Sequence, residues 1–282
     1  MPTANVNVHN ETGSHYFSGQ GVLLIGARGA DGNPTGLRPI GNVSALKITI
    51  ANSVTDHKGA QDGQRAIDKR LVTETKPTVS FDMESLISTN LSMALRGTAT
   101  TSPGATVVAQ AVTGYVGLVS SLGFVNVSAV TVTSAESTPL TLVQYTTPTA
   151  AWDWRVNMDS GSITLNDGVS FGALNSGLDA LAAGAATLLT VGFTYAAQKY
   201  VNALATPSQE MYLRFEGLNT TENDANGDFS PVVVEVWKMS VDPMKELDLI
   251  TDAFAKATVE GAILADYTKS SGNRFFRVTQ LN

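Results

Sequence analysis

The sequence predicts an all-β protein, a sandwich or barrel-like domain with one flanking α-helix and a long β-hairpin. Apolar residues recur mostly on a two-residue period, and turns rich in Gly, Asn and Asp separate these runs, as in antiparallel sheets. Only one segment, 82–97, has clear helical spacing along most of its length. With 282 residues, 43% of them hydrophobic, the chain can build a sizeable core. We expect a single domain over 1–282, whose first residues, 1–19, form a flexible N-terminal arm.

The clearest strands form a long hairpin over 42–81. Apolar and polar residues alternate in 42–51, and the alternation returns in 70–81. Between them, 52–69 is polar and contains glycine, which predicts a loop far longer than usual for a hairpin. Such a loop buries too little apolar surface to offset its ordering cost, so we expect it to become ordered against another subunit. The predicted subunit or ring contacts are its polar side chains: Asp56, His57, Lys58, Asp62, Arg65 and Asp68.

The predicted helix covers 82–97. Ile87, Leu91 and Leu95 recur every four residues, so they share one face. Asp82 stands at the N-cap position and Gly97 at the C-terminal stop. One amphipathic helix on a β-rich body is expected to cover an open end or face of the sheet.

The remaining strands are short and separated by turns. In 188–203, Val191, Phe193 and Tyr195 alternate with smaller residues, which favours a strand over the helix that the alanines of 184–200 also allow. The other predicted strands are 21–27, 105–112, 125–133, 152–158, 162–165, 211–218 and 231–241.

Composition excludes several classes of protein. The net charge is −7, from 18 Lys and Arg against 25 Asp and Glu with no basic run, which argues against a protein that grips nucleic acid. The chain has no cysteine, so a disulfide framework and a thiolate metal site are both excluded. We find neither a signal-peptide pattern nor an apolar run of the roughly 18 residues that a membrane helix needs, and we expect synthesis in a cytosol and no membrane partner.

Charged residues make up only 15% of the chain, below the roughly 25% of ordinary soluble domains. Little of the surface is therefore protected by charge. This is expected of a protein whose surface is largely covered by further copies of itself.

Short motifs do not support catalysis. The segment 168–172 satisfies the G-x-S-x-G pattern of α/β-hydrolases with Ser170 in the nucleophile position. That fold places its histidine after the serine, whereas His9, His15 and His57 all precede it. A plain Gly/Ser turn is favoured, and an enzyme using Ser170 is the last alternative. The histidines also lack metal-ligand spacing, so we predict no enzyme activity and no cofactor.

Two possible ligand sites are outweighed by structural interpretations. Glu222, Asp224, Asn226 and Gly227 are similar to the first half of a calcium loop, but Val233 stands where a bidentate Glu is needed, which favours a hairpin turn over weak Ca²⁺ binding. The segment 26–29 follows an apolar strand but lacks the pattern of a phosphate-binding loop, so a turn is favoured there as well.

Two residue pairs share a strand face. Trp152 and Trp154 could stack on a sugar or base, but large aromatics more often anchor a core or a subunit contact. Arg214 and Glu216 are more simply explained as a solvated ion pair than as an acid/base site.

The segment 232–266 carries a resemblance to a known family. A strand with Lys238 leads to Asp242-Pro243, which suits a helix start, and a Leu-x-Leu-Ile-x-Asp-x-Phe run follows at 247–254. This arrangement resembles the C-terminal region of the major tail tube proteins of long-tailed bacteriophages. Further pieces similar to that family, in the same order, are 41–57 with its alternating strand, 82–84, 152–163 and 213–219. The segment 98–150 is the least similar to the family, so an added lobe in this segment stays an alternative.

The resemblance implies a structural virion protein. In that family, subunits form closed hexameric rings whose strands join into one inner barrel, and the rings stack into a hollow tail tube. The implied partners are further copies of the chain, a tape-measure protein, other tail proteins and double-stranded DNA that passes without sequence-specific binding. The implied location is the virion. The alternatives are another β-sandwich virion protein, such as a tail terminator or capsid decoration protein, and a carbohydrate- or surface-binding module using the two tryptophans.

Overall fold

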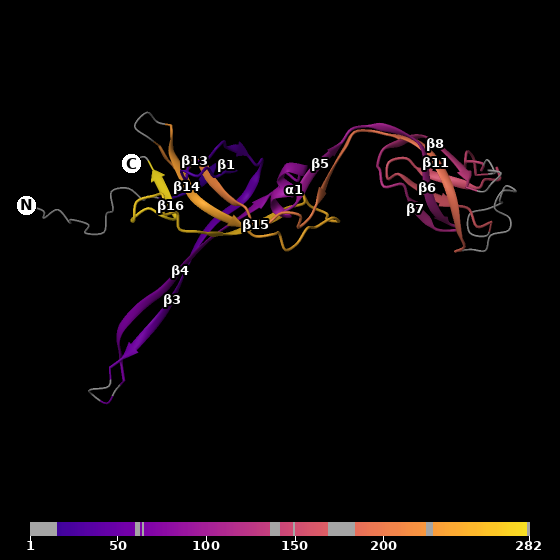
Figure 1. Ribbon diagram of the computed structural model, residues 1–282. Helices are drawn as coiled ribbons and strands as arrows, with labels where there is room; N and C mark the ends of the chain where they lie inside the picture. The colour runs from indigo at the N-terminus through magenta and orange to yellow at the C-terminus, as the bar shows by residue number, and fades with distance from the viewer. Residues whose placement is uncertain are drawn as a thin grey trace, which may run out of the picture. The chain divides into compact units, whose positions relative to one another are not determined.

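The computed structural model describes residues 16–59, 63, 65–135, 142–148, 150–168, 184–223 and 228–280 (Figure 1). Strands dominate these residues and α1 (Ser88–Ala94) is the one helix among them, so the predicted all-β fold class with a flanking helix is confirmed. The chain divides into two compact units, Met1–Ala99 with Val201–Asn282, and Thr100–Tyr200. An added lobe was considered for the segment 98–150. The second unit begins close to the start of that segment but extends to Tyr200.

The first unit is built on one eight-stranded sheet in which all the neighbouring strands are antiparallel. Its strand order is β2 (Arg38–Pro39), β1 (Gly19–Ala27), β13 (Glu210–Asn223), β14 (Phe229–Val241), β15 (Ala257–Ile263), β4 (Ile67–Met83) and β3 (Val43–Lys58). β16 (Phe276–Gln280) also pairs with β14. The long hairpin predicted over 42–81 is confirmed as β3 and β4, which pair from Val43↔Met83 to Lys58↔Ile67.

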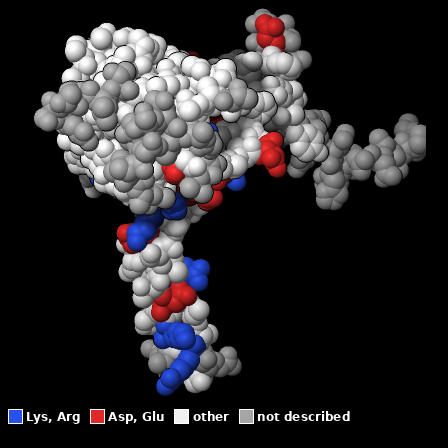
Figure 2. Space-filling model, turned by 90° about the vertical axis from the view of Figure 1, so that its right-hand side faces the viewer, with Lys and Arg blue, Asp and Glu red and all other residues white. Residues whose placement is uncertain are grey.

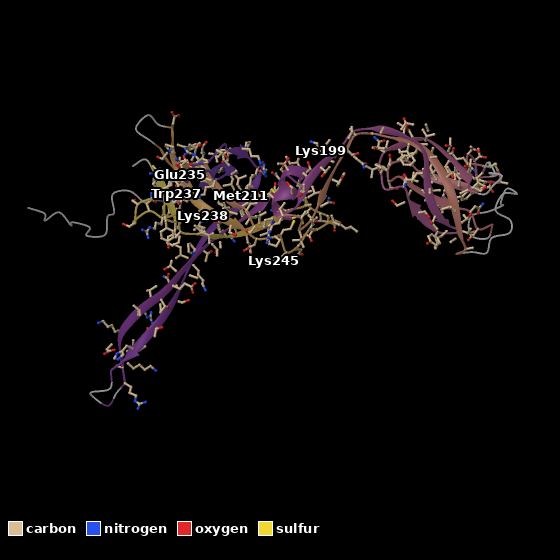
Figure 3. The ribbon with its side chains drawn as sticks, in the orientation of Figure 1. Lys199, Met211, Glu235, Trp237, Lys238 and Lys245 are labelled. Atoms are coloured by element: carbon tan, nitrogen blue, oxygen red, sulfur yellow. The ribbon has the colours of Figure 1, made fainter. Side chains whose placement is uncertain are left out.

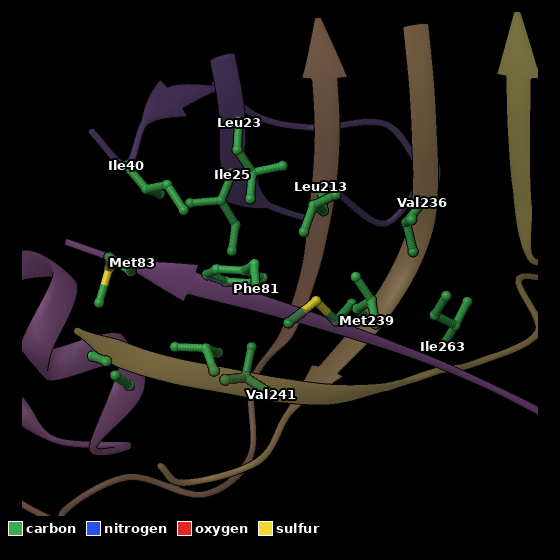
Figure 4. Packing of buried hydrophobic residues seen from close by; sticks show 14 residues of the cluster. Leu23, Ile25, Ile40, Phe81, Met83, Leu213, Val236, Met239, Val241 and Ile263 are labelled. Carbon is green, nitrogen blue, oxygen red and sulfur yellow. The ribbon is translucent and has the colours of Figure 1, made fainter. Parts of the chain in front are cut away.

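Alternation along the strands builds the core of this unit (Figure 4). Val79, Phe81 and Met83 occupy every second position of β4 and are buried, as the period of a half-buried strand requires. They pack in one cluster with apolar residues from β1, β13 and β14, among them Ile25 and Leu213. The alternation of 70–81 therefore marks a buried face at Val79 and Phe81, but not at Leu71, which is 65% exposed.

The helix is shorter than predicted. β4 continues to Met83 and pairs with β15 up to Met83↔Ala257, so Asp82 is a strand residue and its carboxylate accepts a hydrogen bond from Thr258 Oγ1 at 2.8 Å. α1 begins only at Ser88, after the exposed Ile87. The prediction of a helix over 82–97 was wrong at both ends, because ladder hydrogen bonds and burial of Met83 outweigh the local capping pattern.

The predicted helix after Asp242-Pro243 is absent: the residues from 242 to 256 are irregular. Of the large apolar residues of the predicted helix, Leu247 is half-buried, whereas Leu249, Ile250 and Phe254 are 84%, 99% and 90% exposed. A short helix is marginal in water unless tertiary packing covers its apolar face. No such packing covers these three side chains in the isolated subunit.

The second unit contains two three-stranded sheets. One has the order β6 (Ala105–Tyr115), β11 (Ala186–Tyr195), β8 (Val127–Ser134), and the other β7 (Val119–Ser121), β10 (Ser162–Leu165), β9 (Trp154–Asn157). Their shared core cluster includes Trp154, Ile163, Leu189 and Phe193. The predicted strand over 188–203 is two strands, because β11 ends at Tyr195 and β12 (Gln198–Asn202) pairs instead with β5 (Thr98–Ser102).

Candidate assembly surfaces

The outer part of the hairpin is strand where the sequence predicted a loop. β3 and β4 pair continuously through most of 52–69, from Asn52↔Thr75 to Lys58↔Ile67, with register shifts at two places. The predicted loop boundaries were wrong because the prediction depended on hydrophobic alternation, which a strand needs only where one of its faces is buried. Here both faces are exposed, so the sequence carries no alternation while the backbone still pairs.

Within this ribbon, three of the six predicted contact residues bind partners on the hairpin itself. Arg70 Nε donates to Asp56 Oδ1 at 2.8 Å, and its NH2 group lies 3.1 Å from Asp56 Oδ2. His57 Nδ1 lies 2.6 Å from Asp68 Oδ1. The hydrogen bond from Arg70 holds the pKa of Asp56 below its ordinary value. These pairs join β3 to β4 across the ribbon and so favour one register.

Two of the other three predicted contact residues lie near the end of the hairpin. Lys58 ends β3 and is exposed, and Arg65 lies in the connection to β4 with a positive φ of 49°. Asp62 lies outside the described residues. Figure 2 shows basic and acidic side chains along the hairpin of β3 and β4, with basic ones gathered toward its tip. Arg70, which the sequence analysis did not select, belongs to the same charged surface.

The hairpin ribbon, defined as 50–58 with 67–77, also exposes large apolar side chains. They are about half exposed or more in the isolated subunit and come from both strands: Ile50, Val54, Ile67, Leu71 and Val72. β15 pairs with β4 only from Thr78 onward, so no third strand supports the ribbon among the described residues. An isolated two-stranded hairpin is at best marginally stable in water. The ribbon therefore lacks, within the described part of the chain, the support that a third strand would give.

β3 is also an edge strand. Among the strands that the structure describes, its only neighbour is β4, so its outer N–H and C=O groups meet no ladder partner. Natural proteins usually keep exposed edges short, cover them or protect them with charge. β3 extends from Val43 to Lys58 and offers a long edge to a further strand.

A groove lies beside the inner half of β3. It has a volume of about 690 Å³ and is lined by residues of β1, β3, β13 and β14 with Phe17 and Asn42. The large apolar side chains on its wall are Phe17, Leu23, Val43, Leu46, Ile48, Phe215 and Val234. The exposed residues Leu249, Ile250 and Phe254 are named here the apolar C-terminal segment. The first unit therefore has both an apolar recess and an exposed apolar segment.

The buried carboxylate of Glu235, labelled in Figure 3, joins three strands of the same sheet through its hydrogen bonds. Glu235 on β14 is 7% exposed and accepts hydrogen bonds from Tyr212 Oη at 2.8 Å, Arg214 NH1 at 2.9 Å and Arg277 NH2 at 2.5 Å. Burial alone would raise the pKa of Glu235, but the hydrogen bonds from Arg277 and Tyr212 outweigh it and the pKa is lowered. The pKa of Tyr212 is raised by burial and by its hydrogen bond to Glu235.

This cluster corrects the interpretation of Arg214. The sequence indicated a solvated pair with Glu216, and that contact exists at 2.6 Å, but the same guanidinium also binds Glu235. Arg277 follows Glu235 by 42 positions, so only the pairing of β16 with β14 brings them together. The cluster fastens β16 to the sheet and has the arrangement of a structural ion-pair network.

The two tryptophans are core residues. Trp152 and Trp154 are both buried, Trp154 Nε1 donates to the carbonyl of Leu142 at 3.0 Å, and Trp152 meets Tyr145 edge to face. Neither ring offers an open face for stacking on a ligand. The structural interpretation of this pair is confirmed.

The other candidate sites fall partly outside the described residues. Ser170, His9, His15, Asp224, Asn226 and Gly227 lie there, as does the side chain of Glu222. Where the chain is described, no group of three or more His, Asp or Glu side chains could hold a metal ion. α1 falls well short of the length and apolar character needed to cross a membrane, and no other described segment is helical.

A comparison with protein families finds one match, a family described as "Protein of unknown function UCP028589", over residues 16–279. No curated protein matches the sequence.

Proposed function

The chain belongs to that family, and we propose that it is the repeating subunit of a bacteriophage tail tube. Subunits join side by side into closed rings, and the rings stack into a hollow tube. The resemblance to tail tube proteins implies that each ring has six subunits. The tube holds a tape-measure protein during assembly and conducts double-stranded DNA. The protein acts through its surfaces and has no catalytic role.

The hairpin ribbon is the observation that carries this proposal. It extends beyond the sheet with both faces exposed and with large apolar side chains such as Leu71 and Val72 in contact with water. A monomeric function gives no reason to keep such a ribbon. A neighbouring subunit would bury these side chains and restore the support that a third strand would otherwise give.

The edge of β3 and the apolar C-terminal segment support the same conclusion. A second copy can supply a strand edge that pairs with β3 and an apolar recess that receives the apolar C-terminal segment. Contacts between unlike patches on identical chains generate rings when the rotation closes. The low charged fraction of 15% also suits a chain whose surface is largely covered after assembly.

The alternatives account for less of the structure. A tail terminator or capsid decoration protein would also expose assembly surfaces, but a ribbon with two open faces suits a subunit with neighbours on several sides. A carbohydrate-binding module would use Trp152 and Trp154, whose rings are buried.

Electron microscopy of the purified chain at high concentration tests the proposal. Striated hollow tubes are the expected result for the unaltered chain. In a shortened variant, Asn-Gly replaces residues 50–77 and joins the paired residues Thr49 and Thr78 by a two-residue turn. We expect this variant to fold, because the core face of β4 is retained, and to form no long tubes.

Hydrogen exchange separates an assembly defect from misfolding. In the unaltered chain, the amides of 50–58 and 67–77 should exchange fast in the free subunit and slowly in the tube. Discrete monomers or single closed particles at every concentration, with equal protection of the ribbon, would contradict the tail tube function.

A further inference from the structure

A pocket in the first unit gathers two arginines and no acid. Its volume is about 230 Å³, and Arg38 of β2 and Arg96 after α1 are its charged lining residues. The rest of its wall is neutral and consists of Thr89, Ser92, Met93, Gly97, Thr206, Pro207, Gln209, Met211 and Val241. In a chain of net charge −7, a pocket with this lining is a local reversal of charge.

Neither guanidinium meets a carboxylate in the described part of the chain. Four other arginines of the first unit do contact a carboxylate: Arg28, Arg70, Arg214 and Arg277. Arg38 NH1 instead donates to the neutral Asn90 Oδ1 at 2.7 Å. The amide nitrogen of Asn90 donates to the carbonyls of Ile40 and Ser85, which fixes its oxygen toward Arg38.

Arg96 carries a buried donor without a partner. Its Nε atom is shielded from solvent and makes no hydrogen bond within the described residues. A buried donor without a partner is costly, so native structures keep few of them; the Nε of Arg274 is another in this unit. This donor is shielded from the pocket as well as from bulk solvent, so a bound group reaches Arg96 through the part of its side chain that lines the pocket.

The backbone fixes Arg96 at the C-terminal end of α1, beside the pocket. Its φ of 48° lies in the left-handed region that residues with a Cβ rarely adopt. The Arg96 carbonyl accepts hydrogen bonds from both the N–H and the Oγ1 of Thr206, each at 3.0 Å. A left-handed residue commonly ends a helix, and the N–H of Gly97 donates to the carbonyl of Ser92 at 2.7 Å as it does at such an end. These contacts hold Arg96 in place at the pocket wall.

From these observations we propose that the pocket binds an oxyanion, a carboxylate or phosphate group held by Arg38 and Arg96. Guanidinium groups present paired N–H donors that match the two oxygens of such a group. The hydroxyls of Thr89 and Ser92 and the amide of Gln209 line the same space and supply further polar contacts. The group arrives either as a free ion or as an acidic side chain of a second copy, and the second source rests on the proposed assembly.

Calorimetric titration of the full chain tests the site directly. The probes are inorganic phosphate and acetate, at a protein concentration that keeps the chain monomeric and with ionic strength held constant by sodium chloride. We expect saturable binding of one ion per chain. Arg96→Gln should weaken it at least tenfold, whereas Arg70→Gln, which removes an equal charge from the hairpin ribbon, should leave it unchanged.

A second pair of variants keeps both arginines in place. Thr89 is exposed at the pocket wall, so substitutions there should fold. Thr89→Glu supplies a carboxylate of its own and should abolish binding of added phosphate, while Thr89→Gln, of the same shape but neutral, should retain it. Equal binding in Arg96→Gln and the unaltered chain, or in the two Thr89 variants, would overturn the proposal, as would a response that never saturates.

Competition identifies the source of the group. If phosphate lowers the extent of self-assembly of the unaltered chain but not of Arg96→Gln, the pocket receives an acidic side chain of a second copy. If phosphate binds without any effect on assembly, the site takes a free ion. Because binding is measured on the monomer, a chain that forms no tubes would still pass or fail this test independently of the tail tube function.

Discussion

The two halves of β4 show how one strand can serve two purposes. From Ile67 to Lys76 every residue is exposed, whereas from Pro77 to Met83 buried residues occupy alternate positions. The inner half pairs with β3 on one side and β15 on the other, and the outer half pairs with β3 alone. The inner half belongs to the stability of the subunit, and the outer half depends on whatever covers it.

This contrast separates folding from assembly. Removing apolar surface from the inner half should lower the free energy of unfolding, because those side chains fill the core. Removing it from the outer half should leave the monomer nearly unchanged and affect only contacts with other copies. Substitutions along one strand can therefore test both roles.

The largest expected effect is that of Phe81→Ala. The side chain is fully buried in the core of the first unit, so its removal leaves a cavity that neighbouring strands cannot fill. We expect a loss of about 3–5 kcal/mol in the free energy of unfolding. Denaturant titration measures it, and a loss below about 1 kcal/mol, the range of surface substitutions, would place Phe81 outside the core.

A smaller effect is expected for Glu235→Gln. The variant weakens the hydrogen bonds that fasten β16 to β14 through Arg277, and we expect a loss of about 1–3 kcal/mol at neutral pH. The matched control is Glu216→Gln, whose partly exposed carboxylate contacts Arg214 at the surface and should matter much less.

The effect of Glu235 should depend on pH. Its pKa in the folded chain lies below the ordinary value of 4.5, so its contribution is complete above pH 4.5 and is lost as the pH falls through the folded pKa. The stability difference between the unaltered chain and Glu235→Gln should therefore shrink in acid. A difference that stays constant from pH 7 to strongly acidic solution would contradict the charged state of Glu235.

The smallest effect on stability is expected for Leu71→Ser with Val72→Ser. Both side chains are more than half exposed on the hairpin ribbon, so each change should shift the free energy of unfolding by no more than about 0.5 kcal/mol. Tube formation, scored by sedimentation, should nevertheless be lost or strongly reduced. Unimpaired tubes would assign the ring contacts to other surfaces and remove the ribbon from the assembly mechanism.

Much of the fold followed from the sequence. Alternation located 70–81 and 42–51 as paired strands, and the strand at 162–165 was predicted with its observed bounds. The burial of Trp152 and Trp154 followed from the tendency of large aromatics to fill cores. In each case the residue pattern itself records one buried face or one large apolar group.

The candidate surfaces were only partly predictable. Asp56, His57 and Asp68 were selected from the composition of the segment. The contacts of His57 with Asp68 and of Asp56 with Arg70 follow from the register of the hairpin. The helix expected at 247–254 failed because local capping and spacing do not guarantee a surface on which the apolar residues can pack.

The sequence by itself determined the all-β class, the core face of the long hairpin and the absence of thiol chemistry, because periodicity and composition are local properties of a chain. Tertiary structure alone decided that the hairpin continues as an exposed ribbon, that Glu235 meets Arg214 and Arg277, and that Arg38 and Arg96 share one pocket. These features join residues far apart in the chain or depend on an unburied backbone. Spacing and hydrophobic pattern carry no record of either, since pairing between distant strands is fixed only when the whole sheet closes around its core.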